Sequence, residues 1–164
     1  MSFSKEVKEE LSKLTNLANK KELKLEFLGY LESNHIEESK KYIKYSTESD
    51  YNIDRFAKII RNLGIENFKI DICGKVFCIV INKKDVSLET FDFNTEIIDD
   101  MKSFIRGLFM GSGSINNPEN KYHLEFRSKK YRRCKEDYRY VRNCRFKFKT
   151  KRKYYLYKRR RRNI

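Results

Sequence analysis

The sequence predicts an α+β fold in which helices pack on one face of an antiparallel sheet, and three observations support it. Two apolar segments with helical periodicity, 23–33 and 96–110, each carry a glycine in their interior. Short stretches rich in Val, Ile and Phe lie between them and predict strands. The two glycines are 78 residues apart, which leaves room for a whole α/β unit. An internal repeat of the order α-ββ-α-ββ-α is therefore expected.

The first repeat is predicted from the spacing of its apolar residues. Helices are expected where these residues recur every three or four positions, and strands where they alternate. Gly64 gives the third helix its C-terminal stop, and Gly74 separates two strands. The predicted helices of this repeat are 4–14, 23–33 and 52–63. Its predicted strands are 36–39, 41–47, 68–72 and 76–81.

The second repeat begins with the helix 96–110 and continues through a glycine-rich exit and a turn to a strand at 122–126. A glycine inside a helix costs about 1 kcal/mol relative to alanine, so its presence indicates close approach of another backbone. We therefore expect the two glycine-bearing helices to pack against each other. The residues expected at that interface are Gly29, Gly107 and Gly113.

Charge divides the chain sharply. Residues 1–126 hold 19 Lys and Arg against 21 Asp and Glu, whereas residues 127–164 hold 19 against 2. The formal net charge of +15 therefore comes entirely from the C-terminal tail. The expected organisation is an N-terminal helix with the first repeat in 1–95, the start of a second and incomplete repeat in 96–126, and a basic tail in 127–164.

Several motifs resemble the WhiA family of bacterial regulators. They are Phe104–Phe109, Gly113-Ser114 and Tyr122–Glu125, together with the opening residues Met1–Leu11, so that the resemblance covers roughly residues 1–126. It implies a cytoplasmic transcriptional regulator of cell division or sporulation. It also implies a degenerate LAGLIDADG homing-endonuclease-like domain before a helix-turn-helix domain, which this chain is expected to lack as a truncated member. The implied partners are DNA and protein regulators, with no membrane, cofactor or small-molecule substrate.

Catalysis is not expected. LAGLIDADG nucleases carry an acidic residue near the end of each motif helix, and the pair holds divalent metal ions. When the motif glycine is matched to Gly29 and Gly107, those positions fall on Asn34 and Ser112, neither of which is a carboxylate. Glu32 stands two positions too early. The alternative is an active homing endonuclease, which would need carboxylates at both positions.

A structural metal site is also not expected. The four cysteines have no CxxC spacing, and the chain has only two histidines, His35 and His123. His123 and Glu125 are two residues apart in a predicted strand and should share a face. No apolar run is long enough for a transmembrane helix, and the N-terminus does not have the pattern of a secretory signal.

Nucleic-acid contacts are predicted in two places. Lys40, Lys41 and Lys44 lie among Tyr42 and Tyr45, so this strand could touch phosphates, although a solvated sheet face explains the pattern equally well. The tail carries the strongest basic run and can release many counterions on binding. A small basic RNA-binding protein is therefore a further alternative. The candidate residues in that run are Arg159, Arg160, Arg161 and Arg162.

The tail also has the composition of a reading-frame error. If its arginines are encoded by AGA or AGG, reading one base later turns them into Glu, Asp or Gly. Residues 127–141 then acquire apolar residues at helical spacing and resemble the WhiA family. If the printed frame is the true one, the tail should be disordered, because it has few aliphatic residues to bury against its charge.

Overall fold

The computed structural model describes residues 2–86, 98–117, 119, 123–127, 148–151 and 154–157. It confirms the α+β class, with helices packed against antiparallel sheets. The helices are α1 (Phe3–Ser12), α2 (Lys20–Glu32), α3 (Asp50–Asn62) and α4 (Ile98–Ser112), with short 3-10 turns at Asn16–Ala18 and Lys83–Asp85. The first sheet contains β1 (Ile36–Glu38), β2 (Tyr42–Thr47), β3 (Phe68–Cys73) and β4 (Val76–Asn82). The second contains β5 (Gly113–Ile115), β6 (Leu124–Arg127), β7 (Phe148–Lys151) and β8 (Tyr154–Tyr157).

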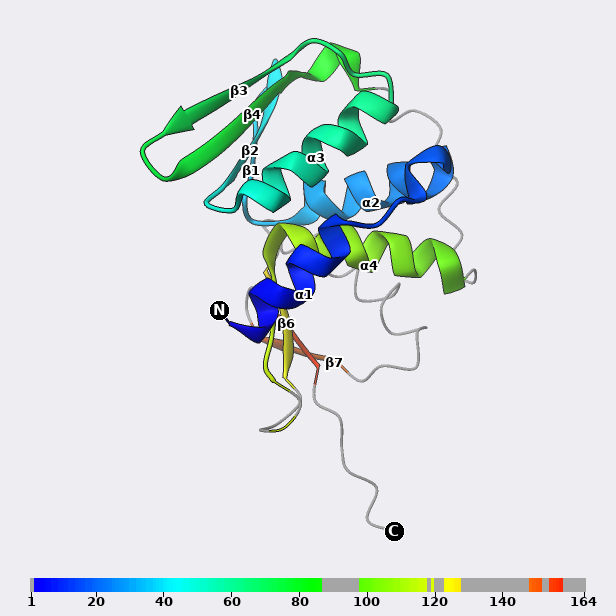
Figure 1. Cartoon of the computed structure of the whole chain (residues 1–164), viewed down its shortest axis with the longest axis vertical. Coiled ribbons are helices and arrows are strands. Elements are labelled where there is room, and N and C mark those ends of the chain that lie inside the picture. Colours follow the sequence, from blue (N-terminus) through cyan, green and yellow to red (C-terminus); the bar gives the residue numbers. More distant parts are fainter. Residues whose placement is uncertain are drawn as a thin grey trace.

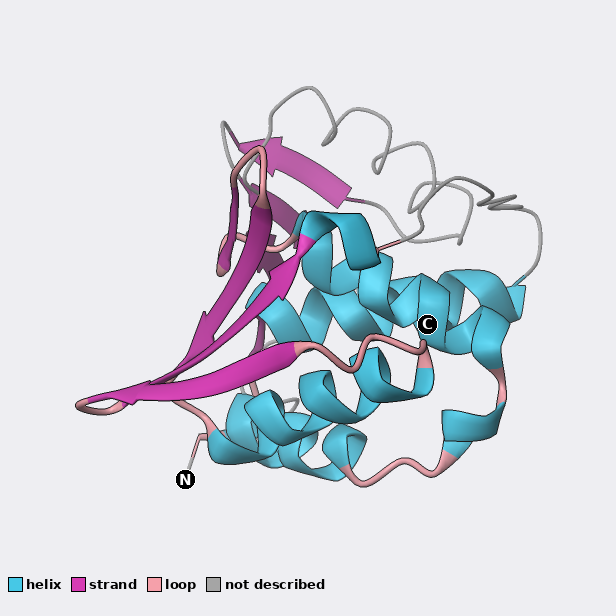
Figure 2. Ribbon diagram, turned by 90° about the horizontal axis from the view of Figure 1, so that it is seen from above, coloured by secondary structure: helices cyan, strands magenta, loops and turns pink. Residues whose placement is uncertain are grey.

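The two sheets are built alike. Their strand orders are β1-β2-β4-β3 and β5-β6-β8-β7, so the same connectivity occurs twice, as an internal repeat requires. Helices α2 and α4 run side by side through the middle of the molecule (Figure 1). Seen from above, the strands lie on one side of the molecule and the helices on the other (Figure 2).

Local sequence signals explain where the helices begin and end. The Asn19 side chain accepts hydrogen bonds from the backbone N–H groups of Lys21 and Glu22, at 3.1 and 3.2 Å, and so caps the start of α2. Ser49 caps α3 in the same way through the N–H of Asn52. Gly64 follows α3 with φ of 85°, a backbone conformation that glycine adopts without strain.

One face of each sheet is buried against the helices. In the first repeat, Ile43 and Tyr45 of β2 lie opposite Ile81 and Ile79 of β4, and all four pack into the core with α2 and α3. A second cluster joins α4 to β6 and contains Phe104, Leu108, Phe109 and Phe126. Val7 and Leu11 of α1 pack against this second cluster, so the N-terminal helix covers it.

Three expectations need correction. The second sheet has four strands, because β8 pairs with β6 and β7 pairs with β8, so it is not confined to its first strand. The predicted disorder of the tail is wrong for those two segments. Strand β5 was not expected, because its sequence, Gly113–Ile115, contains the end of a glycine-rich stretch that indicated a loop. Whether the tail reflects a frame error stays a prediction.

Among the residues that the structure describes, no helix has both the length and the apolar character needed to cross a membrane.

Candidate functional site

Helices α2 and α4 approach each other so closely that Gly29 and Gly107 have no room for a side chain. A Cβ atom on Gly107 would lie 2.7 Å from the carbonyl carbon of Glu26, and closer still to its oxygen. A Cβ on Gly29 would lie 2.5 Å from the amide nitrogen of Leu108, and closer still to the carbonyl oxygen of Phe104. Each glycine therefore faces the backbone of the other helix. The same contact is made from both sides, by α2 of the first repeat and α4 of the second.

The third glycine of the predicted interface has a different environment. Gly113 begins β5, and a Cβ there would meet the Phe109 side chain of its own repeat and lie 2.6 Å from the Phe109 Cα. It does not face α2, so its assignment to the helix–helix interface is wrong. Gly111 takes that place instead, because its Cβ would lie 2.5 Å from the Cβ of Ser33 at the end of α2.

The C-terminal ends of α2 and α4 converge on one backbone carbonyl. Asn34, two residues after α2, donates its backbone N–H to the carbonyl oxygen of Arg127 at 3.2 Å. Ser112, the last residue of α4, donates its hydroxyl hydrogen to the same oxygen at 2.5 Å. These are the two positions at which the family resemblance implies carboxylates in nucleases. Here both side chains are neutral, and the two residues hold the end of β6.

The surroundings of this point add no group of metal ligands. Across the described parts of the chain, no three His, Cys, Asp or Glu side chains gather where they could hold a metal ion. Glu32 ends α2 and is half-buried. A hard divalent cation requires several oxygen ligands, most of them from carboxylates or carbonyls. Neither Asn34 nor Ser112 contributes a carboxylate at this point.

A buried ion network lies farther along the same helix pair, and the local sequence pattern did not reveal it. Glu26 of α2 and Arg55 of α3 are both fully buried. Arg55 donates Nε–H and Nη2–H to the two carboxylate oxygens of Glu26, each at 2.9 Å. Arg106 of α4 donates its Nε–H to Glu26 Oε2 at 2.8 Å. One carboxylate therefore ties three helices together beside the Gly107 contact.

Two further donors of Arg55 bind the chain outside the three helices. Its Nη1 donates to the carbonyl oxygen of Leu14 at 2.6 Å, and its Nη2 donates to the side-chain oxygen of Asn16 at 2.8 Å. These bonds fix the segment between α1 and α2. The amino-acid composition could have indicated this network. Residues 1–126 contain only three arginines among 19 basic residues, and arginine is favoured over lysine where bidentate geometry is needed.

A second set of buried hydrogen bonds links the same three helices. The Tyr30 hydroxyl donates to the side-chain oxygen of Asn52 at 2.7 Å, and the Asn52 amide donates to the carbonyl oxygen of Met110 at 2.7 Å. Burial raises the pKa of Tyr30 and of Tyr45 well above their ordinary values, so both stay neutral. Burial lowers the pKa of Lys8 to about 8, and its ammonium nitrogen lies 5.4 Å from the centre of the Phe109 ring.

Only some side chains of the predicted basic strand are exposed. Lys40 and Lys41 lie in the turn before β2 and are exposed, and Lys44 is half-buried on the sheet face away from the helices. Tyr45 is 1% exposed and belongs to the core, so its place beside Lys44 in one binding surface is wrong. Glu37 of β1 lies directly opposite Lys44 and offsets its charge. The four arginines 159–162 lie outside the described residues.

The two histidines lie on different segments, since His35 directly follows Asn34 and His123 immediately precedes β6. His123 Nε2 lies 3.5 Å from Glu125 Oε2, as expected for residues that share one face. His35 is exposed, and its backbone carbonyl accepts a hydrogen bond from the Ser46 N–H. Neither residue belongs to a group of metal ligands in the described structure.

This architecture is that of a LAGLIDADG-type domain. The crystal structure of the N-terminal LAGLIDADG domain of a DUF199/WhiA protein superimposes with a TM-score of 0.74 over 98% of this chain and 85% of that one, at 21% identity. The homing endonuclease I-DmoI in complex with DNA and Mn superimposes with a TM-score of 0.54 over 85% of this chain and 89% of that one, at 14% identity. These structures show the fold.

Sequence comparison leads to the same family. A model described as the WhiA LAGLIDADG-like domain matches residues 101–164. A probable cell division protein WhiA of Clostridium novyi (strain NT) is 31% identical over 93 residues, which cover 54% of this chain and 27% of that protein. Sequence and fold together confirm the resemblance to the WhiA family. The aligned segments span between 8% and 27% of the first two curated relatives.

Proposed function

We propose that this protein is a WhiA-like, non-catalytic, DNA-binding regulator of transcription in cell division or sporulation. One observation carries the absence of catalysis. At the ends of the motif helices, Asn34 and Ser112 bind the carbonyl oxygen of Arg127 and present no carboxylate. Activation of water by a divalent cation needs ligands that hold the ion. The curated relatives are named as cell division proteins, which supports a regulatory role.

Binding to DNA is proposed from charge and from the fold. The matched endonuclease fold was solved in complex with DNA. In this chain the first sheet offers little positive charge of its own, because Glu37 faces Lys44 and Lys83 pairs with Glu38. Residues 1–126 carry a net charge of −2, whereas residues 127–164 carry +17. Affinity for phosphates should therefore reside mainly in the tail, through counterion release.

The proposal predicts that the purified chain does not cut DNA with Mg²⁺ or Mn²⁺. The measurement incubates the chain with supercoiled plasmid and with a pool of mixed-sequence duplexes, and follows nicking and linearisation on gels. I-DmoI with its own target serves as the positive control for buffer and metal. The expected result is no cleavage above the level of a metal-free sample.

Two variants sharpen this measurement. Glu32→Gln removes the carboxylate that is nearest to Asn34 in the sequence. Glu48→Gln, at an exposed position before α3, is its control. Both should be as inactive as the unchanged chain. Metal-dependent cleavage by the unchanged chain that Glu32→Gln abolishes and Glu48→Gln preserves would replace the regulator with an active nuclease.

A further inference from the structure

Strand β3 forms an open edge of the first sheet. Among the strands that the structure describes, the order β1-β2-β4-β3 gives it one partner, β4, and its residues 69–73 are exposed. Half of the N–H and C=O groups of such a strand point away from its partner and can pair with another strand. The β3–β4 hairpin projects beyond α3, so the helices do not cover this edge (Figure 1).

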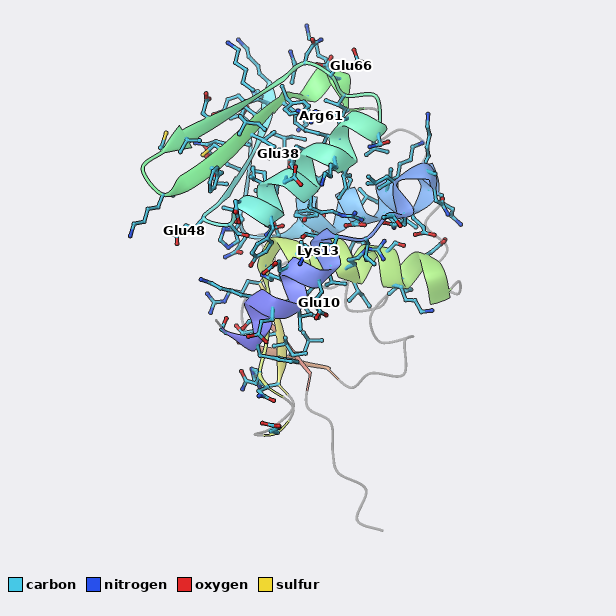
Figure 3. The ribbon with its side chains drawn as sticks, viewed as in Figure 1. Glu10, Lys13, Glu38, Glu48, Arg61 and Glu66 are labelled. Atoms are coloured by element: carbon cyan, nitrogen blue, oxygen red, sulfur yellow. The ribbon has the colours of Figure 1, made fainter. Side chains whose placement is uncertain are left out.

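The helix-side face of β3 is apolar and only partly covered. Phe68, Ile70 and Ile72 lie opposite Ile81, Ile79 and Phe77 of β4. Arg61 belongs to α3 (Figure 3). Its guanidinium carbon lies over the Phe68 ring, 5.2 Å from the ring centre. Beyond that point the cover ends, because Ile70 is 44% exposed and Ile72 is 66% exposed. Large aliphatic side chains on a free strand edge mark a surface suited to strand pairing.

The opposite face of β3 carries two charges of opposite sign. Lys69 and Asp71 lie opposite Val80 and Cys78, on the side away from the helices. They flank Ile70 symmetrically. When the strand is turned antiparallel onto a copy of itself with Ile70 at the centre, Lys69 of each copy meets Asp71 of the other. Phe68 then meets Ile72, and Ile70 meets Ile70. Opposite charges and apolar pairs placed directly across an antiparallel ladder are stabilising.

We propose that β3 pairs antiparallel with β3 of a second copy of this chain, centred on Ile70, and joins the two first sheets into one. The charge pattern favours a second copy of this chain as the partner, because Lys69 and Asp71 of each copy meet the opposite charges of the other. The other edge of this sheet does not have this property. Strand β1 has three residues, two of them glutamates, so its self-pairing would bring like charges together. In this register five residues a side, 68–72, pair with each other, which is a small interface, so the dimer should be weak and concentration-dependent.

Sedimentation velocity of the full chain tests this pairing, from micromolar to near-millimolar protein. The unchanged chain should shift from monomer to dimer as its concentration rises. Asp71→Lys places two lysines against two lysines and should raise the dissociation constant about tenfold or more. The double variant Lys69→Asp with Asp71→Lys restores opposite charges across the pair and should restore dimerisation. Glu37→Gln on β1 is the control and should leave dimerisation unchanged.

Each outcome decides the proposal. A chain that stays monomeric throughout, or a dimer that Asp71→Lys does not weaken, overturns it. A loss that the double variant does not restore also overturns it, because the register centred on Ile70 requires recovery. Circular dichroism of every variant should match the unchanged chain, since all three positions lie on the outward faces of edge strands.

Discussion

Gly107→Ala is expected to lower the free energy of unfolding by about 3 kcal/mol or more, because the new methyl group would overlap the Glu26 carbonyl. The obstacle is backbone, so it cannot move aside as the end of a flexible side chain could. Helix propensity acts in the opposite direction and would favour alanine by about 1 kcal/mol. The sign of the change therefore distinguishes a required close approach from a tolerated glycine. Urea denaturation measures it.

The control for this experiment is Lys20→Ala, an exposed position at the start of α2, the other helix of the pair. It should change stability by about 0.5 kcal/mol or less. Gly29→Ala should behave like Gly107→Ala, since its Cβ would press on the backbone of α4. A Gly107→Ala chain that is more stable than the unchanged one would show that the helices do not touch at this point.

Glu26→Gln is expected to destabilise the fold by about 3 to 5 kcal/mol, because it leaves the buried Arg55 without a counter-charge. Glu22→Gln is the matched control. Glu22 lies 3.7 Å from Arg106 and is 32% exposed, so its loss should cost about 1 kcal/mol or less. Denaturation curves of both variants give the comparison.

A double-mutant cycle separates the pair from its other contacts. Arg55→Gln should be costly by itself, because Arg55 also binds Leu14 and Asn16. The combined Glu26→Gln and Arg55→Gln change should cost less than the sum of the two single changes. Strict additivity would mean that the carboxylate and the guanidinium do not stabilise each other.

Local sequence predicted the helices and most strands of the first repeat well. Apolar residues recur at helical spacing in α3, and Gly64 marks its end, so both features could be read from neighbouring residues. The two motif glycines could also be predicted, because an interior glycine in an apolar helix needs a packing reason. Strand β5 could not be predicted, since Gly113–Ile115 include the end of a glycine-rich stretch and form a strand only through pairing with β6.

The buried network could not be predicted from local pattern. Glu26 is one of several charged residues along α2, and its main partner is 29 residues away on another helix. Likewise, the convergence of Asn34 and Ser112 depends on where β6 ends. The resemblance located these two positions, but only the three-dimensional arrangement showed that a backbone carbonyl occupies the space between them.

A measurement of DNA binding by the full chain tests the proposed function most directly. Binding is measured by fluorescence anisotropy on mixed-sequence duplexes at several salt concentrations. The unchanged chain should bind without sequence preference and weaken steeply as salt rises. Changing Arg159, Arg160, Arg161 and Arg162 to glutamine should reduce affinity, and the salt slope should fall by about 0.9 for each phosphate that is no longer neutralised. Changing Lys40, Lys41 and Lys44 to glutamine should have little effect. If instead the lysine variant loses affinity and sequence preference while the arginine variant binds normally, the first sheet reads DNA and the proposed role of the tail is contradicted.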